Sequence, residues 1–298
     1  MKIFDCFMFY DEDVILDLRL NILDKYIDYF VIVESKFFHN GKERKLKFNL
    51  EKYSKFKDKI IYIIHDKQPI GIQKILDEDP PEFISWKKIS NALLRENDQR
   101  NFISKGLDIA DENDLILISD VDEIPNLEKI KLKNTKNEIL MFVQDIFYYK
   151  LNRYLPNFNW FGTKGCLKKN LISPQWLRNI KSKKYSFLRI DTFFSNKKYI
   201  NKKFINEGGW HFSNLKSAED LELKLKSYLH HMDYEAEELG KTKIEKRMNA
   251  NETIYDMFGD KTSKKYGDDK KRKLDIYEIN KLPIFIQKNL EKYKNWID

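Results

Sequence analysis

The chain has 298 residues, of which 42% are hydrophobic and 14% aromatic, a globular composition that excludes an intrinsically disordered protein. Its formal net charge of +8 is modest and dispersed, so it is compatible with an anionic partner such as a nucleotide but identifies none. Two distant cysteines, Cys6 and Cys166, and only 10 glycines provide no disulfide framework, no zinc spacing and no phosphate loop of the GxGxxG or GxxxxGK type.

From residue 3 to residue 118 the chain alternates apolar strands with amphipathic helices. In chain order, the patterns predict a strand at 3–10, a helix at 14–23, strands at 29–33 and 59–64, a helix at 86–110 and a strand at 115–118. This alternation predicts an α/β fold with a mostly parallel central sheet flanked by helices. Because several strands end on polar residues, among them Asp11, Glu34, His65 and Asp120, we expect these side chains to share one rim of the sheet.

Beyond residue 122 the predicted strands are shorter, and their connections are rich in aromatic residues. Strands are predicted at 139–143, 146–151 and 162–168, and a helix at 217–230. We expect a mixed or antiparallel edge of the sheet in this part. The charged run at 260–273 is typical of a solvated loop. No break in composition requires a second unit, so we predict one domain over 1–235 and a helical C-terminal extension, 236–298, packed on it.

The segment LILISDVDEIP (115–125) carries the strongest functional signal. Four apolar residues form a short strand that stops on Asp120 and Asp122. Side chains at i and i+2 of an extended segment point the same way, so both carboxylates should project beyond the carboxyl end of the strand, with Val121 facing away. Ligands bind at that edge of an open α/β sheet, and two hard oxygen donors suit Mg²⁺ or Mn²⁺ and, through it, a diphosphate. The alternative is that the acids only cap a following helix.

Several segments, in order, resemble glycosyltransferase family 17. They are FVIVESKFFHNGKERKLKF (30–48), ENDQRNFISKGL (96–107), the acidic segment (115–125), GGWHFSNL (208–215) and KLKSYLHH (224–231). An acid–x–acid pair alone is a weak pattern, whereas the ordered set that includes GWHFS is more specific. The resemblance implies a GT-A-like (Rossmann-like) fold and a metal-dependent, inverting transfer of a sugar. The sugar, N-acetylglucosamine or a related hexose, would pass from a UDP-sugar to a glycan or lipid-linked acceptor in polysaccharide or glycan biosynthesis.

The resemblance also implies roles for individual residues. Mn²⁺ or Mg²⁺ would be held by Asp120, Asp122 and His211, with Asp122 also counted as catalytic. The expected donor-binding residues are Glu34, Asn97, Arg100, Asn101, Asp120 and Trp210. Structural alternatives remain: Arg100 could pair with Glu96 or Asp98, Glu34 could cap a turn, and Trp210 and His211 could pack in the core.

Inversion requires a group that takes the proton of the acceptor hydroxyl. The favoured candidate is Glu207, directly before the GGWH segment. Glu123, Asp145, His230 and His231 are alternatives, because the distance from the reacting carbon decides the role and the sequence does not contain it.

Two other classes of function compete with this one. A phosphohydrolase-like enzyme also uses an acid–x–acid pair after a strand, but its further downstream motifs are not found. A non-catalytic carbohydrate-binding protein would account for the aromatic residues, and the lack of nucleic-acid-binding motifs argues against a nucleic-acid partner. No apolar run approaches the ~20 residues that cross a bilayer, and the chain begins with a strand-like segment rather than a signal pattern. We therefore expect a cytoplasmic enzyme with at most peripheral membrane contact.

Overall fold

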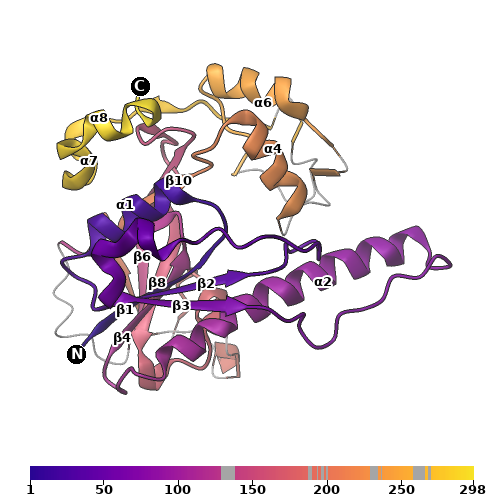
Figure 1. Ribbon diagram of the computed structural model, residues 1–298, viewed down its shortest axis with the longest axis horizontal. Coiled ribbons are helices and arrows are strands. Elements are labelled where there is room, and N and C mark those ends of the chain that lie inside the picture. Colours follow the sequence, from indigo (N-terminus) through magenta and orange to yellow (C-terminus); the bar gives the residue numbers. More distant parts are fainter. Residues whose placement is uncertain are drawn as a thin grey trace.

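The computed structural model describes residues 1–128, 138–186, 190–192, 194–195, 198, 201–228, 234–235, 237–257, 266–267 and 270–298. Within these residues a large sheet of 11 strands forms the centre of the molecule, and helices cover both of its faces (Figure 1). The predicted α/β class with a helix-flanked sheet is therefore confirmed. The alternative catalytic residues His230 and His231 lie outside the described residues.

One half of the sheet is parallel. Its strands lie in the order β4-β1-β2-β3, with bounds Leu115–Asp120 (β4), Ile3–Phe9 (β1), Tyr29–Ser35 (β2) and Ile60–His65 (β3). The strands read as continuous apolar runs because helices shield both faces. Since all four run the same way, their carboxyl ends meet at one rim. In register, Ser35 lies beside His65, and Asp120 lies beside Met8 of β1.

The other half of the sheet is mixed. β8 (Trp160–Leu167) runs antiparallel to both β4 and β6 (Ile139–Tyr148). β6 is parallel to β9 (Lys202–Ile205) and β10 (Gly209–Ser213), and β10 is antiparallel to β5 (Glu123–Pro125). The short strands β7 (Arg153–Tyr154) and β11 (Asp275–Ile276) complete the edge. The sheet as a whole is thus mixed rather than mostly parallel, because short connections between β6, β7 and β8 permit antiparallel pairing.

Two predicted boundaries differ from the structure. The helix predicted at 86–110 is α2 (Pro81–Asn101) followed by a separate 3-10 turn, η2 (Phe102–Leu107). Pro81 at the first helical position accounts for the earlier start. The strands predicted at 139–143 and 146–151 are a single strand, β6, with a register shift between Met141 and Val143. The polar pair Gln144-Asp145 made one bulged strand look like two.

The remaining helices are short. They are α1 (Asp13–Leu23), α3 (Pro174–Asn179), α4 (Ala218–Ser227), α6 (Gly240–Asn249), α7 (Ile284–Lys288) and α8 (Leu290–Tyr293). The 3-10 helices besides η2 are η1 (Leu50–Lys59), η4 (Lys168–Asn170), η5 (Ile190–Thr192), η6 (Ile279–Lys281) and η7 (Lys294–Trp296). None of the helices in the described part of the chain combines the length and apolar character needed to cross a membrane.

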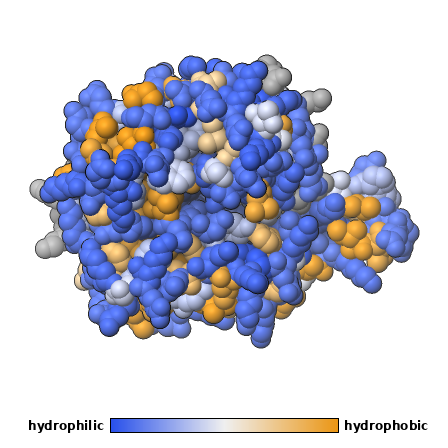
Figure 2. All heavy atoms as spheres, turned by 45° about the horizontal axis from the view of Figure 1, so that its top comes forward, coloured by the Kyte–Doolittle hydropathy of each residue, from blue (hydrophilic) through white to orange (hydrophobic). Residues whose placement is uncertain are grey.

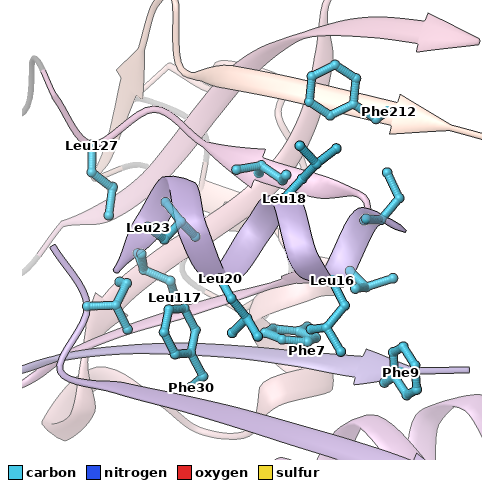
Figure 3. Packing of buried hydrophobic residues seen from close by; sticks show 14 of the residues in the cluster. Phe7, Phe9, Leu16, Leu18, Leu20, Leu23, Phe30, Leu117, Leu127 and Phe212 are labelled. Atoms are coloured by element: carbon cyan, nitrogen blue, oxygen red, sulfur yellow. The ribbon is translucent and has the colours of Figure 1, made fainter. Parts of the chain in front are cut away.

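Three clusters of buried side chains hold these elements together. The first lies between the sheet and α1, where Leu16 and Leu20 face Phe7 and Phe30 of the strands (Figure 3). The second lies on the opposite face of the sheet, under η2 and α3, and the third lies under α4 and α6. Residues after 236 take part in the first and third clusters, for example Ile286. The boundary near residue 235 stays a prediction.

α2 projects from the body of the molecule (Figure 1). Its outer half and the loop before it carry a hydrophobic patch at the end of this projection (Figure 2). Phe83 and Trp86 stack with ring centroids 5.4 Å apart, and both are about half exposed. The inner end of α2 reaches the rim of the sheet, where it contributes to the site described next.

Candidate active site

The acid turn, residues 120–123, joins β4 to β5 at the rim of the sheet. Val121 is buried in the cluster under α1. Asp120 and Asp122, on either side of it, instead form ion pairs with side chains from α2, α3 and β10. The charge of Asp120 also acts on the ionisation of Asp122, which shows that the two carboxylates are neighbours. The acid turn therefore gathers two anions beyond the carboxyl end of β4.

Asp120 lies between two guanidinium groups. Nη2 of Arg100, from the last turn of α2, lies 3.0 Å from its Oδ1, and Nη2 of Arg178, from α3, lies 3.0 Å from its Oδ2. Burial raises the pKa of this carboxyl, but Arg178 and Arg100 outweigh burial and hold the pKa well below its usual range. Asp120 is therefore ionised at neutral pH, and both of its oxygens are engaged.

Arg178 connects the acid turn to β8. Besides Asp120, it donates to both oxygens of Glu123, at 2.7 and 3.1 Å, and to the carbonyl oxygen of Gly162. The indole N–H of Trp160 donates to Oε1 of the same Glu123 at 2.7 Å, and the backbone N–H of Asp120 donates to its Oε2 at 2.8 Å. The buried carboxylate of Glu123 is thus fully committed within the protein. The role of proton acceptor that the sequence left open for Glu123 stays untested.

Asp122 faces His211, which comes from β10. Nε2 of the imidazole lies 3.5 Å from Oδ2 of the carboxylate. Burial lowers the pKa of His211, but the adjacent Asp122 outweighs burial and raises the pKa above its usual value. Burial conversely raises the pKa of Asp122, and His211 outweighs it and lowers that pKa. The pair is held by opposite charge, and the ring of Trp160 packs against the imidazole with centroids 4.8 Å apart.

The Asp122–His211 pair fits one part of a metal site. Nδ1 of His211 is buried and finds no hydrogen-bond partner among the described residues. Within those residues, no three His, Cys, Asp or Glu side chains form a group that could hold a metal ion. A carboxylate and an imidazole are nevertheless suitable ligands for Mn²⁺, and ions of this kind commonly take one or two protein carboxylates together with phosphate oxygens of the substrate. The donor set therefore suits an ion that is completed by a bound diphosphate.

Arg100, in the last turn of α2, contacts the acid turn, whereas Asn101, the next residue, contacts α3. Arg100 is 3% exposed, and its two Nη atoms also donate to Glu96 at 2.9 Å and to the side chain of Gln175 at 2.6 Å. Asn101 accepts the backbone N–H of Gln175 at 3.0 Å and so fastens the first turn of α3. Asn97, one turn before, is half-buried. Among these three predicted donor-binding residues, Arg100 is bonded to the acid turn in the described part of the chain, and Asn101 supports α3, which carries Arg178.

Glu34 is directed into the protein rather than toward the acid turn. Its fully buried carboxylate accepts hydrogen bonds from Arg44 (2.8 Å), the backbone of Lys47 (2.7 Å) and Phe48 (3.0 Å), and the hydroxyl of Tyr62 (2.8 Å). These contacts anchor the loop that follows β2. In this structure Glu34 therefore fastens the loop that follows β2, and its donor-binding role stays a prediction.

Trp210 and Glu207 lie on the other side of β10 from His211. Side chains alternate along a strand, and Trp210 packs against the cluster under α1. Glu207 is exposed in the turn before β10, and its charge acts on Asp145 and Tyr277, which are hydrogen-bonded to each other at 3.3 Å. The structure thus does not bring Trp210 or Glu207 to the acid turn.

Four further residues lie near the acid turn, and three of them, Arg178, Trp160 and Tyr255, carry no signal in the sequence. Arg178 lies in PQWLRN and Trp160 opens β8, and neither belongs to a recognisable motif. Tyr255 lies close to Asp122, where burial and that carboxylate raise the pKa of its hydroxyl to about 12. Lys224 of α4 adds positive charge, since it lowers the pKa of Asp122. Only Lys224 belongs to one of the segments that carried the resemblance.

Ser35 and His65, at the ends of β2 and β3, form a hydrogen-bonded series with Asp98 of α2. Oγ of Ser35 lies 3.1 Å from Nδ1 of His65, and Nε2 of His65 lies 2.7 Å from Asp98 of α2. Ser35 is only 4% exposed, and its Oγ accepts the backbone N–H of Phe37 at 3.1 Å. A buried, engaged hydroxyl is a poor nucleophile. The Ser35–His65–Asp98 series therefore fastens β2, β3 and α2 to one another. It does not support a serine hydrolase.

Comparison with known proteins gives one positive finding. The model of glycosyltransferase family 17 matches residues 1–297, nearly the whole chain. The match includes every element that forms the site, from β1 to the C-terminal helices. A comparison with curated proteins found no match.

Proposed function

The chain belongs to glycosyltransferase family 17, and on that premise we propose that it transfers a sugar from a UDP-sugar to a hydroxyl of a glycan or lipid-linked acceptor. The protein is a glycosyltransferase, and its family suggests a nucleotide-sugar donor and a glycan acceptor. We further propose N-acetylglucosamine or a related hexose as the sugar, inversion at its anomeric carbon, and dependence on Mn²⁺ or Mg²⁺.

The observation that carries this proposal is the cluster of two arginines, one imidazole and two ionised carboxylates at the sheet rim. Arg100 and Arg178 flank Asp120 at 3.0 Å, and His211 faces Asp122 at 3.5 Å. A diphosphate carries several acceptor oxygens, and guanidinium groups bind them with a planar fork of donors. A site with fixed cations and carboxylates side by side suits a diphosphate together with a divalent ion.

We propose Asp122 and His211 as the metal-binding pair. Asp120 has each oxygen bonded to an arginine, so it would act on the ion only after releasing one of them. In its observed position it instead orients Arg100 and Arg178 toward the diphosphate. When bound, the ion supplies Lewis-acid stabilisation of the charge on the departing UDP. Arg100 and Arg178, held by their protein partners, would add fixed positive charge beside the departing UDP.

The direct test is a calorimetric donor screen with the full chain. UDP, GDP and CDP sugars are titrated with and without Mn²⁺, and the best binder is assayed for transfer. We expect a UDP-sugar to bind at least about 10-fold more tightly with Mn²⁺, and Asp122→Asn to abolish that increment. Equal binding of the donor with and without Mn²⁺ in the wild-type protein would show that the metal-dependent mechanism is wrong.

A further inference from the structure

Arg19 is an arginine buried among apolar neighbours. It lies on α1 (DVILDLRLNIL), and the other buried residues of this helix are leucines and an isoleucine. Arg19 is 0% exposed. Its partner Asp5 is also 0% exposed and lies within the apolar strand β1. Nε and Nη2 of Arg19 donate to the two oxygens of Asp5 at 2.7 and 2.6 Å. A planar, two-bond ion pair of this kind holds the guanidinium in one orientation.

The other hydrogen bonds of Arg19 are donated to the acid turn and to Ser119, the residue before it. Nη2 donates to the hydroxyl of Ser119. Nη1 donates to three carbonyl oxygens of the acid turn, those of Asp120 (3.0 Å), Val121 (3.1 Å) and Glu123 (2.9 Å). The fourth carbonyl oxygen, that of Asp122, accepts the backbone N–H of Phe212 from β10 at 2.9 Å. Every carbonyl of the acid turn is thus bound from inside the protein.

This arrangement determines where the two carboxylates point. Three of the four carbonyls of the acid turn face Arg19 of α1, the side on which Val121 is buried, whereas the side chains of Asp120 and Asp122 form ion pairs with Arg178 and His211. A lysine could not replace the guanidinium, because one ammonium cannot reach a carboxylate and three carbonyls at once with fixed geometry.

Stability alone gives a weak reason for this ion pair. Two buried charges lose their hydration, and well-packed apolar side chains of similar volume commonly stabilise such a position as well or better. The cluster around Arg19 is already rich in leucine and phenylalanine. The ion pair therefore supplies what apolar residues cannot, a fixed set of hydrogen-bond donors for three carbonyl groups of the acid turn.

We propose that Arg19, oriented by Asp5, is a positioning residue of the active site: it fixes the backbone of the acid turn so that Asp120 and Asp122 face the donor diphosphate. The catalytic part of this inference rests on the proposed function. The structural part, that Arg19 holds the acid turn, does not depend on it.

The test compares Arg19→Lys and Asp5→Asn with the wild-type chain. Arg19→Lys keeps the charge beside Asp5 but lacks the fork, and Asp5→Asn keeps the fork but weakens its orientation. Hydrogen exchange of the amides of residues 120–123 and of Phe212 should be at least about 10-fold faster in both, while α6 amides are unchanged. The kcat for transfer should fall about 100-fold with the KM for the acceptor unchanged, because a small displacement of the acids affects reaction more than acceptor binding.

Arg153 offers a matched control. It makes the same kinds of contact, a two-bond ion pair with Asp298 and a hydrogen bond to the carbonyl of Met248, on β7, which β6 separates from β10. Arg153→Lys should leave exchange at the acid turn and kcat unchanged. Unchanged exchange at the acid turn in a folded Arg19→Lys or Asp5→Asn protein would overturn the inference. A wild-type chain that binds no nucleotide sugar would overturn the proposed function instead, and the exchange data would still decide the role of Arg19.

Discussion

Oδ2 of Asp122 and Nε2 of His211 lie 3.5 Å apart, and the two residues reach this position from β-segments that are remote in the chain. Phe212, next to His211, donates its backbone N–H to the carbonyl of Asp122 at 2.9 Å, so the backbone itself sets the spacing of the pair. The pairing of β10 with β5 aligns His211 with Glu123 and thereby completes the connection. The Asp122–His211 pair is consequently held in position by the pairing of β10 with β5.

We expect Asp122→Asn and His211→Gln each to lower transfer at limiting Mn²⁺ by at least about 100-fold, or ~2.7 kcal/mol. Both substitutions preserve shape and remove a metal ligand. Steady-state rates measured across a Mn²⁺ titration check this, with Asp275→Asn, on the exposed strand β11, as the control. If both variants match the wild-type rate at every Mn²⁺ concentration of the titration, the pair does not bind the metal.

A second prediction concerns the glycine before Trp210. Gly209 has φ +131°, and a Cβ there would lie 2.1 Å from the carbonyl oxygen of Ile124 on β5. Gly209→Ala should therefore destabilise the protein by about 2 kcal/mol or more and displace His211, as measured by urea denaturation and by transfer rate. Gly240→Ala is the matched control, since Gly240 also has positive φ, +72°, but a Cβ there would have no atom within 4 Å. A cost for Gly209→Ala no larger than that of Gly240→Ala would contradict the prediction.

These two sites mark how far the sequence could predict the structure. The acid–x–acid spacing predicted two neighbouring carboxylates at the end of a strand, because that arrangement depends on local geometry alone. The residues that hold the site, Arg19 and Arg178, depend on which distant elements pack together. Arg19 did carry a signal, a charged residue within an apolar helix, whereas Arg178 carried none.

The sheet shows the same division. The parallel half could be predicted, because its strands alternate with helices in the chain. The mixed or antiparallel edge was also predicted and is confirmed, but its strand order could not be, because β8 inserts between β4 and β6, and nothing in the sequence of β8 specifies an antiparallel neighbour on each side. The placement of Trp160 and Gly162 beside the acid turn follows from that insertion.

A third prediction concerns the pH dependence of stability. Lys164 on β8 is 6% exposed and donates to the carbonyl oxygens of Arg178 and Ile180 at the end of α3. Burial first and Arg178 second lower the pKa of Lys164 to about 7, with Glu123 opposing them. In the unfolded chain this pKa is about 10.4. Between these values the unfolded state binds a proton that the folded state lacks, so this residue makes the free energy of unfolding rise with pH.

Lys164→Met should remove that contribution. The free energy of unfolding of the wild type minus that of the variant should therefore increase from pH 7 to pH 9, by at most about 1.4 kcal/mol per pH unit. Urea denaturation at several pH values measures the difference, and the subtraction cancels the other titrating groups. A difference that stays constant or falls over this range would show that Lys164 keeps its proton in the folded protein.

The last prediction concerns the proton acceptor. A base positioned at the acceptor hydroxyl contributes about 10²- to 10⁴-fold, so loss of the true base should reduce kcat by that factor. Glu207 lies in the turn before β10, five positions before Phe212, the residue bonded to the backbone of Asp122. It is also on the side of β10 that faces Asp145 and Tyr277. From this position we expect Glu207→Gln to retain kcat within about 3-fold. A 100-fold loss, with unchanged thermal stability and with Asp145→Asn still active, would instead establish Glu207 as the base and require the acceptor to bind around the edge of β10.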